Sequence, residues 1–164
     1  MAEELAARII RTAIERGATI AVAESLTGGL VVASLVSVPG ASAVVRGGVV
    51  AYATPLKHSL LGVDAELLAR EGAVDPNVAM QMAEGVRAAA SVDASPAAFG
   101  VATTGVAGPD PQDGRPVGLV YVGVASAAGA ESIALQLTGD RQAIRAAATT
   151  AALEALLGVL TRNV

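Results

Sequence analysis

Short apolar runs typical of β-strands alternate with helix-like segments along the whole chain. Residues 3–16 carry apolar side chains at helical spacing and end at Gly17, which predicts an amphipathic helix. Residues 18–23 are short and apolar, as in a buried strand, and a helix through about Ser37 follows. Residues 44–53 predict the next strand. This alternation indicates an α/β fold, in which helices cover a central sheet.

The second half of the chain continues the same pattern. It contains, in order, a short helix opened by Pro55, a second at 64–71, a longer helix from Pro76 to about Ala90, a strand at 97–103, a loop at 104–116, two strands at 117–126 and 131–138 joined at Ala128-Gly129, and a final helix from its cap Asp140 to about Leu160. The predicted architecture is a three-layer α/β/α sandwich with a mixed, mostly parallel sheet, formed by residues 1–164 as a single domain.

Composition limits how this domain is built and what it binds. Hydrophobic residues make up 53% of the chain but aromatic residues only 2%, so the core must consist of Ala, Val, Leu and Ile. Such a core suits a sheet buried on both faces, and the excess of small and apolar residues predicts a homo-oligomer. The formal charge of −4 and the lack of a Lys/Arg block argue against nucleic-acid binding.

Single residue types exclude several kinds of site. The chain has no cysteine and one histidine, His58, which rules out a disulfide, a cysteine nucleophile, a zinc–cysteine site and a multi-histidine metal site within one subunit. His58 itself is interpreted as structural or solvent-facing. The acidic N-terminus is unlike a signal peptide, and Gly, Ser or Pro interrupts apolar runs before the ~20 residues of a membrane span. We therefore expect a cytoplasmic protein without a membrane contact.

The first candidate for chemistry is Ser25, at the point where a strand gives way to a helix. Ligands bind at this edge of open α/β sheets. Gly28 and Gly29 let backbone N–H groups approach a ligand, and a helix N-terminus favours negative charge. The alternative is that Ser25 or Thr27 simply caps the helix.

Tyr52 and Lys57 form the second candidate, at the exit of the next strand. A lysine near a serine can act as its general base if burial keeps the amine neutral, and a tyrosine hydroxyl can relay or orient the proton. The alternative is a solvated lysine and a half-buried strand tyrosine.

A glycine-rich loop and an arginine complete the set of candidates. Thr104, Gly105 and Gly108 follow a strand and can form a nest of N–H groups for an oxyanion or phosphate, or a simple tight loop. The sequence there fits neither the P-loop nor the dinucleotide fingerprint. Arg141 enters the last helix and can reach a phosphate or form a surface ion pair.

The joint order of these segments resembles the CinA C-terminal-domain family, the group of PncC-type nicotinamide-nucleotide amidohydrolases. The resembling segments run almost from end to end: Ala23-Glu24-Ser25 with Thr27-Gly28-Gly29, Pro39-Gly40-Ala41-Ser42, Gly47 to Tyr52 with Lys57, Leu61-Gly62-Val63, Gly72-Ala73-Val74, Met82-Ala83-Glu84-Gly85, Thr104 to Pro109, Arg115-Pro116-Val117-Gly118 and Gly139-Asp140-Arg141. The chain departs from the family at Leu26, where relatives often have cysteine, and at Asp110-Pro111 in the loop.

The resemblance implies a function and assigns roles. It implies hydrolysis of nicotinamide mononucleotide to nicotinate mononucleotide and ammonia, without metal or cofactor. The family's serine, tyrosine and lysine fall on Ser25, Tyr52 and Lys57, its substrate loop on Thr104 to Gly108, and its basic residue on Arg141. Two alternatives remain: a non-catalytic nucleotide-binding or regulatory module, and an amidase for another small carboxamide.

Overall fold

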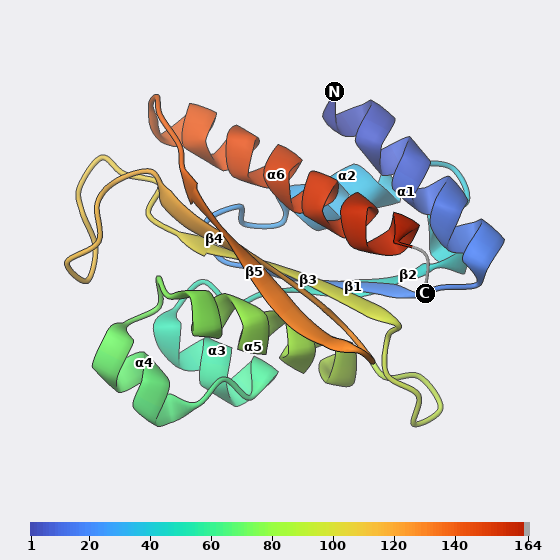
Figure 1. Cartoon of the computed structure of the whole chain (residues 1–164), viewed down its shortest axis with the longest axis horizontal. Coiled ribbons are helices and arrows are strands. Elements are labelled where there is room, and N and C mark those ends of the chain that lie inside the picture. The colour runs from blue at the N-terminus through green and yellow to red at the C-terminus, as the bar shows by residue number, and fades with distance from the viewer. Residues whose placement is uncertain (163–164) are drawn as a thin grey trace.

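The computed structural model describes residues 1–162 (Figure 1). The elements are, in order, α1 (Ala2–Arg16), β1 (Ile20–Glu24), α2 (Leu30–Val36), the short 3₁₀ helix η1 (Ala41–Ala43), β2 (Val45–Val50), α3 (Thr54–Leu61), α4 (Ala65–Glu71), α5 (Pro76–Ala89), β3 (Phe99–Gly105), β4 (Leu119–Ser126), β5 (Gly129–Gln136) and α6 (Arg141–Thr161). Each predicted strand and helix is present, with ends that differ by a few residues.

A single five-stranded sheet runs through the middle of the molecule in the order β2-β1-β3-β4-β5. Strand β1 pairs in parallel with both β2 and β3, whereas β4 is antiparallel to its neighbours β3 and β5. The predicted mixed sheet is therefore confirmed, with β4 alone running against the other strands. Because β1, β2 and β3 run in parallel, their carboxyl ends meet at one edge, where ligands bind in folds of this type.

Helices cover both faces of the sheet, which confirms the three-layer sandwich (Figure 1). On one face, α1, α2 and α6 pack large aliphatic side chains against Ile20 and Val22 of β1. On the other face, α3, α4 and α5 pack against Ala21 and Ala23 of the same strand. The alternation of side chains along a strand thus places bulky residues on one side and small residues on the other.

Glycines bring α5 unusually close to its neighbours. A Cβ atom at Gly100 or Gly123 of the sheet would lie 2.0 or 2.2 Å from a backbone oxygen of α5, and one at Gly85 would lie 1.8 Å from the Leu61 oxygen of α3. No side chain fits at these distances. Small residues therefore let the backbones approach closely in a chain with only three aromatic side chains to fill a wider gap.

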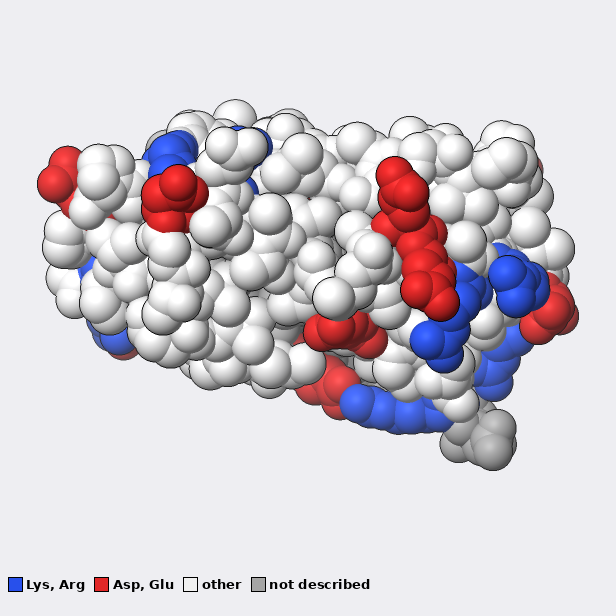
Figure 2. Space-filling view, turned by 90° about the horizontal axis from the view of Figure 1, so that it is seen from above, with Lys and Arg blue, Asp and Glu red and all other residues white. Residues whose placement is uncertain are grey.

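Helix α6 is the one described helix long and apolar enough to cross a membrane by length and composition. The sequence analysis predicted this helix but did not identify it as a candidate span. It packs on β3, β4 and α1, and Ile144, Leu153 and Leu156 are among its buried residues. Its apolar character therefore matches its place as a core helix. Figure 2 shows the outer face of this layer, where acidic and basic side chains are interspersed around an uncharged middle.

Candidate active site

Ser25 and Lys57 meet at the carboxyl end of β1. Ser25 follows β1 directly, and Lys57 projects from the first turn of α3. The Lys57 Nζ atom lies 3.0 Å from Ser25 Oγ and donates a hydrogen bond of 2.7 Å to the Ala51 carbonyl oxygen. Ser25 is 8% exposed and Lys57 is fully buried. The solvated lysine considered as an alternative is therefore wrong.

Burial makes Lys57 an unusually weak base for a lysine. Desolvation disfavours its charged form and lowers the pKa of the amine to about 8. Within residues 1–162 its hydrogen-bond partners are a hydroxyl and a carbonyl, with no carboxylate to stabilise an ammonium ion. An appreciable fraction of the amine is thus neutral near neutral pH, as a general base requires.

The buried carboxylate of Glu24 caps α2. This corrects the expectation that the backbone N–H groups at Gly28 and Gly29 bind a ligand. Its Oε2 accepts from the N–H groups of Gly29 and Val31, both at 3.0 Å, and its Oε1 accepts from Val32 at 2.9 Å. The carboxylate of Glu24 therefore occupies the N-terminus of α2, and these three N–H groups are not available to bind a substrate. Neither Ser25 nor Thr27 is the cap.

The other residues of the turn also make their hydrogen bonds within the protein. The Thr27 side chain is fully buried, and its hydroxyl lies 2.8 Å from that of Thr103. The Gly28 N–H donates to the Ser25 carbonyl at 3.0 Å. Thr27, Gly28 and Gly29 thus shape the turn behind Ser25, and they are not among the residues that line the cavity beside it.

A cavity of about 300 Å³ opens in front of Ser25. Its wall is formed by Thr104 and Gly105 at the end of β3 and by the loop that follows, which includes Gly108; the predicted loop thus begins within the strand. The Thr104 hydroxyl donates to the Ala73 carbonyl oxygen at 2.6 Å, which joins the end of β3 to the segment between α4 and α5. The volume is at the lower end of the range for small-molecule sites.

Tyr52 and Arg141 lie together at the mouth of this cavity. Arg141 Nη2 donates to the Tyr52 hydroxyl at 3.0 Å, and Nη1 donates to the Gly108 carbonyl at 2.6 Å. Tyr52 is 60% exposed, so its hydroxyl faces Arg141 and does not stand between Lys57 and Ser25. The structure brings Ser25 and Lys57 into direct contact and leaves Tyr52 with Arg141 at the entrance. Arg141 makes no ion pair with a described carboxylate.

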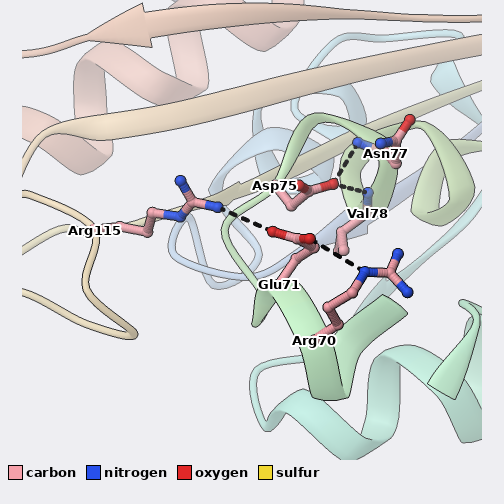
Figure 3. A network of polar contacts seen from close by, with 6 residues as sticks. All are labelled: Arg70, Glu71, Asp75, Asn77, Val78 and Arg115. Atoms are coloured by element: carbon pink, nitrogen blue, oxygen red, sulfur yellow. Dashed lines mark hydrogen bonds and ion pairs between the residues drawn. The ribbon is translucent and has the colours of Figure 1, made fainter. Parts of the chain in front are cut away.

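Polar contacts hold the far end of the cavity loop against α4 (Figure 3). Arg115 of the loop lies 3.7 Å from Glu71 at the end of α4, and Glu71 also contacts Arg70. The adjacent Asp75 accepts from the N–H groups of Asn77 and Val78 and so caps α5. These contacts fix the segments on both sides of Ala73 and Val74, which line the cavity.

Sequence reasoning missed two residues that build the site. The capping role of Glu24 had a signal, since an acidic residue lies just before a predicted helix start. No sequence signal indicated the role of the half-buried Arg145 of α6, because its hydrogen-bond partners Leu26 and Thr27 lie 119 and 118 residues away. His58 has its Nδ1 atom 2.7 Å from the Val63 carbonyl, which agrees with a structural role. Leu26 packs into the core.

The fold and the site together define a three-layer α/β/α domain with a buried serine–lysine pair at the carboxyl edge of its sheet. The chain belongs to the CinA C-terminal domain family, whose sequence model matches residues 2–160. It is 51% identical over 141 residues to a CinA-like protein of Frankia casuarinae and 46% identical over 144 residues to a putative competence-damage inducible protein of a Geobacillus species. These matches cover 86% and 87% of this chain but 31% and 33% of the relatives, so the chain spans about a third of their length.

Solved structures share the whole fold. The competence/damage inducible protein from Agrobacterium tumefaciens superposes with a TM-score of 0.89 at 38% identity, covering 98% of this chain and 96% of that protein. The competence damage-inducible protein A from Klebsiella pneumoniae superposes with a TM-score of 0.91 at 33% identity, covering 98% of each chain. Both agree with the family assignment.

Proposed function

We propose that this chain hydrolyses the carboxamide of nicotinamide mononucleotide to nicotinate mononucleotide and ammonia. One observation carries the proposal: a fully buried amine with a lowered pKa lies 3.0 Å from a serine hydroxyl on the wall of a cavity. Burying a lysine without a carboxylate partner costs stability, so the arrangement calls for a functional reason.

The contact between Lys57 and Ser25 supports direct proton transfer. When Lys57 is neutral, the Ser25 hydroxyl can donate its proton to Nζ, while an N–H of the amine still donates to the Ala51 carbonyl. Ser25 Oγ then forms a bond to the carboxamide carbon. The Lys57 ammonium returns the proton to the departing nitrogen, and the C–N bond breaks to release ammonia. Water, deprotonated by Lys57, hydrolyses the acyl-serine and restores the hydroxyl.

The Leu26 amide is our candidate to stabilise the oxyanion of the tetrahedral intermediate. Leu26 follows the nucleophile and lines the cavity, which is the position that supplies an oxyanion N–H in other serine hydrolases. No described residue accepts a hydrogen bond from this N–H group.

Arg141 and Tyr52 are placed to recognise the part of the substrate that does not react. A phosphate at the cavity mouth could take over the guanidinium bonds that Arg141 now makes to Gly108 and Tyr52. In this proposal Tyr52 acts in binding at the entrance, and proton transfer proceeds without it.

Ammonia release from purified protein tests the function. Nicotinamide mononucleotide should be hydrolysed, and nicotinamide riboside, which lacks the phosphate, should be hydrolysed with a lower kcat/KM. Ser25→Ala should abolish turnover, whereas Ser59→Ala, at an exposed position of α3, should not. Calorimetric binding without ammonia release would contradict the proposal and favour a nucleotide-binding module. Preference for another carboxamide would retain the chemistry and change the substrate.

A further inference from the structure

Arg145 connects α6 to the turn that follows Ser25. Its Nε atom donates to the Leu26 carbonyl at 2.8 Å, and its Nη2 atom donates to the Thr27 carbonyl at 3.3 Å. Gly28 makes room for this contact, since a Cβ atom there would lie 3.3 Å from Nη2 and the backbone φ is +58°. The guanidinium group therefore contacts the turn from the side of α6, in the layer opposite to that of Lys57.

These bonds fix three consecutive peptide units after the serine. The Ser25 carbonyl accepts from Gly28, the Leu26 carbonyl accepts from Arg145, and the Thr27 carbonyl accepts from both Arg145 and the Leu30 N–H. In a trans peptide unit the N–H points opposite to the carbonyl. The Thr27 N–H shares a peptide unit with the Leu26 carbonyl, so the bond from Arg145 directs this N–H away from α6. The Leu26 N–H shares a unit with the Ser25 carbonyl, which Gly28 holds within the turn, and Arg145 acts on it by fixing the next peptide unit of the same turn.

Those two N–H groups lack an acceptor among residues 1–162, although Leu26 is 4% exposed and Thr27 is fully buried. Buried backbone N–H groups are almost always hydrogen-bonded, so unpaired ones beside a nucleophile suggest donors kept for the reaction. Leu26 is the one of the pair that lines the cavity.

We infer that Arg145 is a positioning residue, which holds the turn so that the Leu26 N–H meets the oxyanion formed on the substrate. The inference rests on the proposed function, because an oxyanion forms only if Ser25 attacks a carbonyl group. Arg145 does not line the cavity, so it acts through the turn and not on the substrate.

Kinetics of Arg145→Met and Arg145→Lys, measured by ammonia release, test this role. Loss of an oxyanion donor lowers kcat by about 100-fold or more in a well-studied protease, and a displaced donor in Arg145→Met should lower kcat by roughly 10- to 100-fold. KM should stay within about twofold and the pH midpoint of kcat/KM should not move. Arg145→Lys should recover part of kcat, since an ammonium group can donate to one of the two carbonyls.

Arg87→Met is the matched control. Arg87 Nε also donates to a backbone carbonyl, that of Ala97, at 2.8 Å in a half-buried setting, but at the opposite end of β3 from Ser25. It should lower the melting temperature by an amount similar to Arg145→Met and leave kcat unchanged.

The outcomes separate the inference from the function. An active wild-type protein with an Arg145→Met variant of normal kcat overturns the inference alone. Equal losses of kcat in Arg145→Met and Arg87→Met also overturn it, because the effect would then follow stability. A wild-type protein inactive on every carboxamide tested overturns the proposed function and this inference together.

Discussion

Lys57 combines an ionisable amine with complete burial, and this combination sets both its basicity and its effect on stability. Its pKa of about 8 lies below the value of 10.5 for a lysine in water because burial removes the solvent that stabilises the ammonium ion. The neutral amine is the form that can accept the proton of Ser25. The same desolvation means that the folded protein holds its proton less tightly than the unfolded chain does.

The rate of hydrolysis should depend on the ionisation of Lys57. We expect kcat/KM to rise with pH and level off above an apparent pKa near 8, since only the neutral amine is the base. Lys57 is the only lysine of the chain, so NMR of protein labelled with [ε-¹³C]lysine gives one side-chain signal to titrate. A signal that titrates near 10.5 would contradict the assignment.

The free energy of unfolding should increase with pH because of the same ionisation of Lys57. Between pH 8 and 10.5 the unfolded chain binds a proton that the folded protein has lost, so raising the pH through this window stabilises the fold. From pH 7 to 10 the wild type should gain roughly 2–3 kcal/mol of unfolding free energy relative to Lys57→Met, which lacks the group. Urea titrations at both pH values measure the difference. An equal pH dependence in the two proteins would be inconsistent with a buried, weakened amine.

At the scale of helices and strands, local signals predicted the elements but not their contacts. Gly17 ends α1 and Asp140 caps α6 through the Ala143 N–H, as the sequence suggested. Gly62, which ends α3 in the left-handed conformation, was not predicted as a helix end. The Arg141–Tyr52 contact joins residues 89 positions apart. The direction of the Tyr52 side chain, toward Lys57 or toward the mouth of the cavity, depends on where α6 places Arg141. No local sequence pattern encodes that position.

Two helical glycines should respond to alanine in opposite directions. A Cβ at Gly85 of α5 would clash with the α3 backbone 1.8 Å away, whereas one at Gly158 of α6 meets no atom within 4 Å. Gly85→Ala should therefore destabilise the protein by about 1–3 kcal/mol or more, and Gly158→Ala should stabilise it by about 0.5–1 kcal/mol through helix propensity. Chemical denaturation of both variants measures the effect. Equal effects at the two positions would mean that α3 and α5 are not in close contact.

At the scale of the molecule, the order of segments was sufficient to predict a three-layer sandwich with a mixed sheet. The composition also predicted a core without aromatic side chains, and the structure shows how glycine contacts replace them. The acidic residue before α2 was a signal for the capping role of Glu24, but the sequence could not show that Arg145 of α6 binds the turn after Ser25. The bonds of Arg145 join residues 119 and 118 positions apart, which no local pattern encodes.

The predicted homo-oligomer can be tested directly. Large apolar side chains such as Val36, Val50 and Leu60 are 44–57% exposed, which favours association. Light scattering coupled to size-exclusion chromatography should return a multiple of the subunit mass of 16.1 kDa. A single 16.1 kDa species at micromolar concentration would contradict the prediction.

The burial of the only lysine also determines how the protein surface reacts with amine-directed reagents. Every exposed cationic side chain is an arginine, apart from the single histidine if it is protonated. Amine-directed dyes, cross-linkers and acetylating reagents therefore meet no accessible lysine side chain in this folded chain. Modification of the Lys57 amine would therefore show that the surroundings of Ser25 had opened to solvent.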